Sequence, residues 1–163
     1  MGDVAPNPAP KGKADDWLDL VRNEERRGDY LRAFDLSVQG IREHPTDNRL
    51  RYRAVLTIAR AGGLRQAREL LGEFGFTVDD ENEDVACLAP RLLKDEALGA
   101  SDARRPLLAR QSAELYRKVF ERTGGYYPGI NSAAMYCLAG DAGAAQSFAA
   151  RVLASVRDTA STG

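Results

Sequence analysis

The fold is decided by two short stretches of sequence, GDYLRA at residues 28–33 and GGLRQA at residues 62–67. In each stretch a glycine is followed five residues later by an alanine, and the two stretches are 34 residues apart. Glycine ends helices readily because it adopts backbone conformations that side chains disfavour, and a small alanine lets two helices approach closely. The spacing therefore predicts two successive pairs of helices.

Apolar residues around these stretches recur at steps of three and four, the pattern of helices that bury one face. Trp17 and Val21 lie on one such face before the first turn, and residues 30–41 continue the pattern after it. Pro45 then closes the first pair, since proline cannot extend a helix. A period of 34 residues is that of the tetratricopeptide repeat. We therefore predict an all-α fold of stacked, antiparallel, tetratricopeptide-like helix pairs forming a short solenoid.

Further along the chain the helix pattern persists while the spacing of 34 residues is lost. The acidic run of residues 79–84 precedes an apolar helical pattern, and acidic residues are favourable at the start of a helix. Because an interior proline costs on the order of 3 kcal/mol, Pro90 must either kink that helix or begin a new one. We expect the break near Ala89.

About four helix pairs account for the chain, and they predict one domain over residues 14–158. Residues 1–13 are rich in proline and glycine and are expected to form a disordered lead-in, and residues 159–163 a frayed tail. A chain of 163 residues with a hydrophobic fraction of 44% fits a single core.

The charge balance gives no reason to expect a nucleic acid or a lipid surface as partner. The formal net charge is -1, so the broad positive field that drives such binding is missing. No apolar run approaches the length of a membrane span, and no apolar signal core follows the first charges. We expect a cytoplasmic protein.

Residues for catalysis or metal binding are scarce. The chain has one histidine, His44, and two cysteines, Cys87 and Cys137, which we interpret as reduced, buried and structural. His44 is expected near a helix C-terminus, where an imidazole interacts well with the helix dipole. Zinc needs several converging soft or imidazole ligands, and no nucleophile is placed beside His44. We therefore expect no enzyme, no metal site and no cofactor.

The stretch YYPGINSAA at residues 126–134, followed by LAGD at residues 138–141, resembles one particular tetratricopeptide-like family. It is the so-called TRAF-binding domain of apoptosis signal-regulating kinases and its bacterial relatives, and the resemblance covers about residues 50–157. It implies a regulatory helical-repeat module of a signalling pathway, in which bacterial versions accompany effector domains. Within the motif, Pro128 and Gly129 are expected to form a turn, and Asn131 to cap the following helix or fix that turn.

Three functional hypotheses remain open. The leading one is a scaffold or regulatory module that binds another protein, or an effector domain of its pathway, on the surface formed by the first helix of each pair. The second is a sensor of a small phosphate-bearing, nucleotide-like ligand, and the third a homo-oligomeric structural component. The sensor would use Arg91, Lys94, Tyr127 and Asn131, and an ordinary solvated face is an equal alternative for the arginines. The candidate binding residues are Arg49, Arg53, Arg60, Arg91, Lys94, Asp95, Tyr127 and Asn131.

Overall fold

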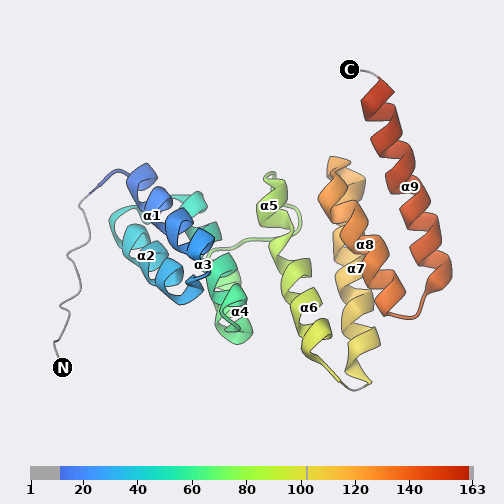
Figure 1. The fold of residues 1–163 in the computed structure, drawn as a ribbon, viewed down its shortest axis with the longest axis horizontal. Coiled ribbons are helices and arrows are strands. Elements are labelled where there is room, and N and C mark those ends of the chain that lie inside the picture. Colours follow the sequence, from blue (N-terminus) through green and yellow to red (C-terminus); the bar gives the residue numbers. More distant parts are fainter. Residues whose placement is uncertain (1–11, 102, 162–163) are drawn as a thin grey trace. The chain divides into compact units, whose positions relative to one another are not determined.

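The computed structural model describes residues 12–101 and 103–161, and within them all regular secondary structure is helical (Figure 1). This confirms the predicted all-α fold of helix pairs. The helices are α1 (Ala14–Arg27), α2 (Tyr30–Glu43), α3 (Asn48–Arg60), α4 (Leu64–Glu73), α5 (Glu83–Ala86), α6 (Leu88–Gly99), α7 (Arg104–Thr123), α8 (Tyr126–Leu138) and α9 (Ala142–Ser161). The shortest of these helices is α5, with four residues.

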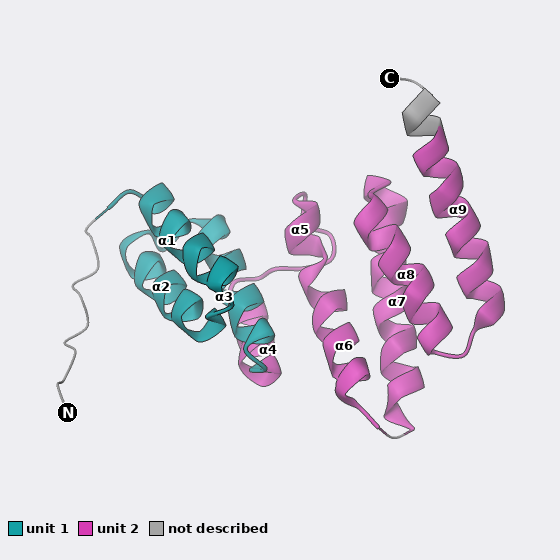
Figure 2. Cartoon of the chain, in the orientation of Figure 1, with its two compact units in different colours: residues 1–63 teal, residues 64–163 magenta. Residues whose placement is uncertain are grey.

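The chain forms two compact units, residues 1–63 and residues 64–163, coloured separately in Figure 2. The unit boundary falls between α3 and α4. Each unit has a cluster of buried apolar side chains of its own. That the span 14–158 behaves as one domain stays a prediction.

The first unit is built on α1, α2 and α3. Trp17 is buried against α2 and α3, and its indole Nε1 donates to the Glu43 carboxylate at 3.2 Å. Gly40 lets the helices approach, because a Cβ there would lie 3.1 Å from Trp17 and from Leu50. The predicted turn glycine Gly28 is left-handed, with φ +78°, which explains why glycine ends α1.

The second unit is organised around α7, which packs along both α6 and α8, while α9 packs on α8. Tyr116 and Val119 of α7 are fully buried in its main cluster. Two buried hydroxyls join neighbouring helices: the Ser112 hydroxyl donates to the Pro90 carbonyl at 2.8 Å, and the Ser132 hydroxyl to the Ala113 carbonyl at 2.9 Å. These bonds fix α6 and α8 against α7.

Pro90 begins a new helix, one of the two outcomes expected from the sequence. The break between α5 and α6 falls at Cys87, two residues before Ala89, and Pro90 occupies the first turn of α6. A proline is tolerated there because backbone N–H groups of the first turn have no partner within the helix.

The Pro-Gly part of the family motif is not a turn, contrary to the prediction. Helix α8 begins at Tyr126, so Pro128 and Gly129 lie within its first turn and Gly129 N–H donates to the Gly125 carbonyl. Glycine is needed for packing. A Cβ at residue 129 would lie 2.7 Å from Val152 of α9 and 2.8 Å from the Phe120 ring of α7.

Both predicted terminal segments lie partly outside the described residues. Of the lead-in, only Gly12 and Lys13 are described, and α1 begins directly after them at Ala14. Of the predicted tail, residues 162 and 163 are outside, and α9 continues to Ser161.

Candidate functional site

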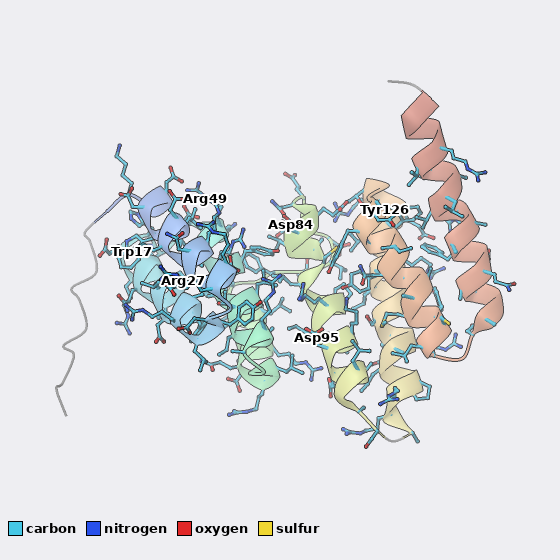
Figure 3. The ribbon with its side chains drawn as sticks, in the orientation of Figure 1. Trp17, Arg27, Arg49, Asp84, Asp95 and Tyr126 are labelled. Carbon is cyan, nitrogen blue, oxygen red and sulfur yellow. The ribbon has the colours of Figure 1, made fainter. Side chains whose placement is uncertain are left out.

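In the first unit, Arg49 is engaged by carboxylates of its own unit. Its guanidinium binds Asp47 at 2.7 Å and Asp15 at 2.6 Å, and hydrogen bonds to both raise its pKa. Asp47 caps α3, accepting from the backbone N–H groups of Arg49 and Leu50. Arg49 is labelled in Figure 3. Arg49 therefore stabilises the start of α3.

Arg53 and Arg60 converge on a single carboxylate, that of Glu25 at the end of α1. Glu25 is only 8% exposed, and its Oε2 accepts from Arg53 Nη1 at 2.8 Å. Arg60 Nη1 lies 3.8 Å from Oε1, and its guanidinium stacks 5.6 Å from the centre of the Tyr30 ring. The two arginines therefore neutralise a buried acid and hold α1 against α3.

In the second unit, the candidates of α6 and α8 come together. Lys94 of α6 donates from Nζ to Asn131 Oδ1 at 2.9 Å, a bond between the first helices of two successive pairs. Arg91 and Asp95 lie one turn apart on α6, with Arg91 Nε 3.8 Å from Asp95 Oδ2. That distance is an ion pair and too long for a hydrogen bond.

Tyr116 of α7 was not among the sequence candidates, and it packs against Tyr127 of α8. Its ring meets the Tyr127 ring edge to face, with centroids 6.0 Å apart. Burial raises the pKa of the Tyr116 phenol, and the neighbouring Tyr127 phenol adds to the increase. Of the residues that the sensor hypothesis grouped by type, Lys94, Tyr127 and Asn131 are joined by hydrogen bonds, and Arg91 lies one turn from Lys94 on α6.

Asn131 does not cap α8, contrary to the prediction, because the helix begins five residues earlier. Its Nδ2 instead donates to the Tyr127 carbonyl at 2.9 Å, one turn back in the helix, while its Oδ1 accepts from Lys94. Asn131 is therefore positioned as a bridge between the backbone of α8 and the side chain of α6.

Large apolar side chains are exposed next to this bridge. Tyr126 is 60% exposed, Ile130 41% and Tyr127 40%, all in the first two turns of α8 (Figure 3 labels Tyr126). We call the α6–α8 surface the set formed by Arg91, Lys94, Asp95, Tyr126, Tyr127, Ile130 and Asn131. The surface combines apolar and charged groups.

The two cysteines and the single histidine lie in different environments. Cys87 is buried, and burial, assisted by Glu83 and Asp84, raises the pKa of its thiol to about 12. Cys137 is exposed, so the prediction that it is buried is wrong: it lies on the face of α8 that turns away from the core. His44 is the C-cap residue of α2, as expected, and its Nε2 is 2.9 Å from the Gly12 carbonyl oxygen.

Two kinds of functional feature are missing from the described part of the chain. No group of three or more histidine, cysteine or acidic side chains is placed to hold a metal ion there. Likewise, none of the described helices combines the length and the apolar character needed to cross a membrane.

Sequence reasoning found the candidate residues of α3, α6 and α8, but it missed Glu25 and Tyr116, which contact some of them from other helices. Glu25 is one of two adjacent glutamates with no pattern to distinguish it, and Tyr116 looked like a core residue. The contact of Tyr116 with Tyr127 can be foreseen only with the knowledge that α7 packs on α8.

The fold is that of a tetratricopeptide-like helical-repeat protein, and its α6–α8 surface carries both apolar and charged side chains. A family model described as "Tetratricopeptide Repeats-Sensor" matches residues 24–136, more than half of the chain, and the chain belongs to this family. Comparison with curated proteins found no match, nor did comparison with solved structures.

Proposed function

We propose that the chain is a non-enzymatic regulatory module that binds a partner protein through the α6–α8 surface. The observation that carries this proposal is the Lys94–Asn131 bond, which joins the first helices of two successive pairs beside the exposed Tyr126 and Ile130. Helical-repeat proteins bind with such contiguous surfaces.

The composition of the surface favours a protein as the occupant. Protein interfaces are enriched in tyrosine and arginine, and their strongest contacts are aromatic or arginine anchors surrounded by weaker polar ones. Here Tyr126 and Ile130 supply apolar anchors, while Lys94 and Asp95 supply charges of both signs. The complementary partner segment carries an apolar side chain flanked by an acidic one, which would meet Lys94.

Membership of the family supports a sensory or interaction role. We further propose that the module is related to the TRAF-binding domain of apoptosis signal-regulating kinases and that it works in the cytoplasm. Its proposed partner is an effector domain of a bacterial-type signalling pathway. Binding of nucleic acid or of membranes forms no part of the proposal.

The test identifies the partner and then measures its affinity. A photo-crosslinking amino acid at position 126, introduced in the native organism, should give one reproducible crosslinked protein. With that protein purified, Tyr126→Ala and Ile130→Ala should each weaken binding by about tenfold or more, as truncation of an interface anchor does.

Leu107→Ala is the matched control, because Leu107 lies in the same unit and is 59% exposed, close to the value for Tyr126. It should leave the affinity unchanged. The proposal is wrong if both α8 variants bind the crosslinked protein as tightly as the wild type does.

A further inference from the structure

The outer faces of α1 and α9, the first and last helices of the described chain, differ in polarity. The exposed residues of α1 are all polar, and they are Asp15, Asp16, Asp19, Arg22, Asn23, Arg26 and Arg27. On α9, by contrast, Arg151 is the only charged residue between Ala142 and Val156. A helix at the end of a repeat array needs a polar outer face to remain soluble without a partner. The exposed side of α1 meets this requirement, and that of α9 does not.

The apolar side of α9 lies next to its contact with α8. Val152 is buried, and a Cβ on Gly129 of α8 would lie 2.7 Å from its side chain. Arg151 projects from one flank of this contact, where its guanidinium is 5.9 Å from the centre of the Phe120 ring of α7. Successive residues of a helix project about 100° apart, so Leu153 lies on the opposite flank. There it is 57% exposed.

Leu153 belongs to a stripe that runs along most of α9. Its members recur at alternating steps of four and three residues, the spacing with which two helices pack along their length. We call the α9 stripe the set formed by Ala142, Gln146, Ala149, Leu153 and Val156. None of the five is charged, and Val156 is 42% exposed in addition to Leu153.

The two halves of the α9 stripe differ in side-chain size, and this makes the stripe complementary to itself. The large side chains, Leu153 and Val156, stand in the second half, whereas the first half offers the alanines at 142 and 145. An antiparallel copy that crosses at Ala149 sets Val156 against Ala142 of the second copy, and Leu153 against Ala145. Large side chains then fill the space above small ones, as close packing requires. Parallel alignment would set large against large and leave gaps between the alanines.

We propose that the α9 stripe is a homodimer interface, on which a second copy of the chain packs its own α9 in antiparallel orientation. The two-fold axis passes close to Ala149, so both copies contribute the same residues. This inference goes beyond the proposed function, and it uses no residue of the α6–α8 surface.

The lack of charge on the stripe favours a second copy as the occupant. The buried centre of an interface is depleted of charged residues, so the occupant must itself present an uncharged apolar face. It must also be large where the stripe is small and small where the stripe is large. The α9 helix of a second copy satisfies both conditions.

The experiment measures the mass of the full chain by sedimentation velocity at concentrations up to about 1 mM, the weak end of specific association. We expect a mass that approaches twice the 17.8 kDa of one chain. Leu153→Glu should weaken dimerisation by at least about tenfold, because it places a carboxylate in an apolar interface. Circular dichroism should show the helix content of the wild type, since Leu153 is exposed in the single chain.

Leu107→Glu is the matched control. Leu107 lies on α7 of the same unit and is 59% exposed, close to the value for Leu153, so this variant should dimerise as the wild type does. The inference is overturned if the wild type stays monomeric over the whole concentration range. It is also overturned if Leu153→Glu dimerises as tightly as the wild type, or if Leu107→Glu weakens dimerisation equally.

Disulfide crosslinking tests the antiparallel orientation. Ala142→Cys and Val156→Cys are made separately in a Cys137→Ser background, which removes the exposed native thiol. Oxidation of a mixture of the two variants should join position 142 of one copy to position 156 of the other, because a disulfide forms only between positions whose Cα atoms lie close together. Crosslinking of each variant to itself, without the mixed product, would overturn the antiparallel interface.

Discussion

The candidate binding arginines of the two units are partnered in different ways. In the first unit, Arg53 and Arg60 are both directed to the buried Glu25 carboxylate. In the second, Arg91 has a carboxylate only at 3.8 Å, and its Nε has no hydrogen-bond partner in the described part of the chain. The sequence gives these residues equal standing as candidates.

The difference shows what makes a basic residue available for binding. A buried carboxylate needs a positive partner, because an unpaired charge is costly in a poorly solvated place. Arginines that meet this need are structural, and changing them weakens the fold. Arginines whose donors are left over can serve a ligand. The contrast leads to experiments that separate stability from binding, unit by unit.

The largest effect is expected from Trp17→Ala in the first unit. Trp17 is 1% exposed and is the largest side chain of its cluster, so its truncation should cost about 3–5 kcal/mol of unfolding free energy. Denaturant unfolding followed by circular dichroism measures this loss. A variant with the midpoint of the wild type would show that the tryptophan is not part of a core.

The two cysteines show whether the second unit unfolds together with the first. Exposed Cys137 should react with a thiol reagent in the native protein, while Cys87 should react only after unfolding of its own unit, because it is buried and its raised pKa of about 12 leaves almost no thiolate at neutral pH. Protection of Cys87 that survives in Trp17→Ala would establish that the units unfold separately. Loss of Cys87 protection together with unfolding of the first unit would establish one cooperative domain.

Glu25→Gln should have the next largest effect, about 1–3 kcal/mol, which is the usual cost of removing the charged partner of a hydrogen bond. The arginines are partly exposed, at 26% and 35%, so solvent limits the loss. Thermal unfolding measures it. If the comparison between the units is right, Asp95→Asn in the second unit should cost less than Glu25→Gln does, and an equal cost would contradict it.

A smaller effect of defined sign is expected at two glycines of the second unit. Gly129→Ala should destabilise by about 1–2 kcal/mol, because its methyl group would lie under 3 Å from Val152 and Phe120. Gly72→Ala is the matched change in α4, where nothing lies within 4 Å of the added Cβ, and it should stabilise by about 0.5–1 kcal/mol. Thermal unfolding of the two variants should therefore shift in opposite directions.

The repeat stretches predicted the fold because they act locally. The left-handed φ of Gly28 and Gly62 and the complete burial of Ala33 and Ala67 follow from the spacing alone. The motif at residues 126–134 was misjudged as a turn and a cap, since Pro128 can stand in the first turn of a helix as well as before it. Only the tight packing of α7, α8 and α9 explains why residue 129 is glycine.

The candidate site was predictable in part for a similar reason. Residues one turn apart on a helix share a face, so Arg91, Lys94 and Asp95 could be grouped from the sequence. Which other helix faces them depends on packing over long sequence separations, such as the 37 residues between Lys94 and Asn131. No local pattern encodes that pairing, and for the same reason Glu25 and Tyr116 were missed.

The smallest change in stability is expected at Asn131, and it is the most direct test of surface against architecture. As a cap, Asn131 would lose about 1 kcal/mol on mutation to alanine. In the middle of α8, alanine is the better helix former, which offsets the lost bond to Lys94. The unfolding free energy of Asn131→Ala should therefore lie within about 0.5 kcal/mol of the wild-type value.

Releasing Lys94 should nevertheless weaken capture of the partner protein identified by crosslinking at position 126. Lys94→Met, which removes the charge from the other side of the same bond, should reproduce this behaviour. If instead Asn131→Ala lowers stability while partner affinity stays unchanged, the Lys94–Asn131 bond only holds α6 to α8, and the second unit uses its polar residues as the first unit does.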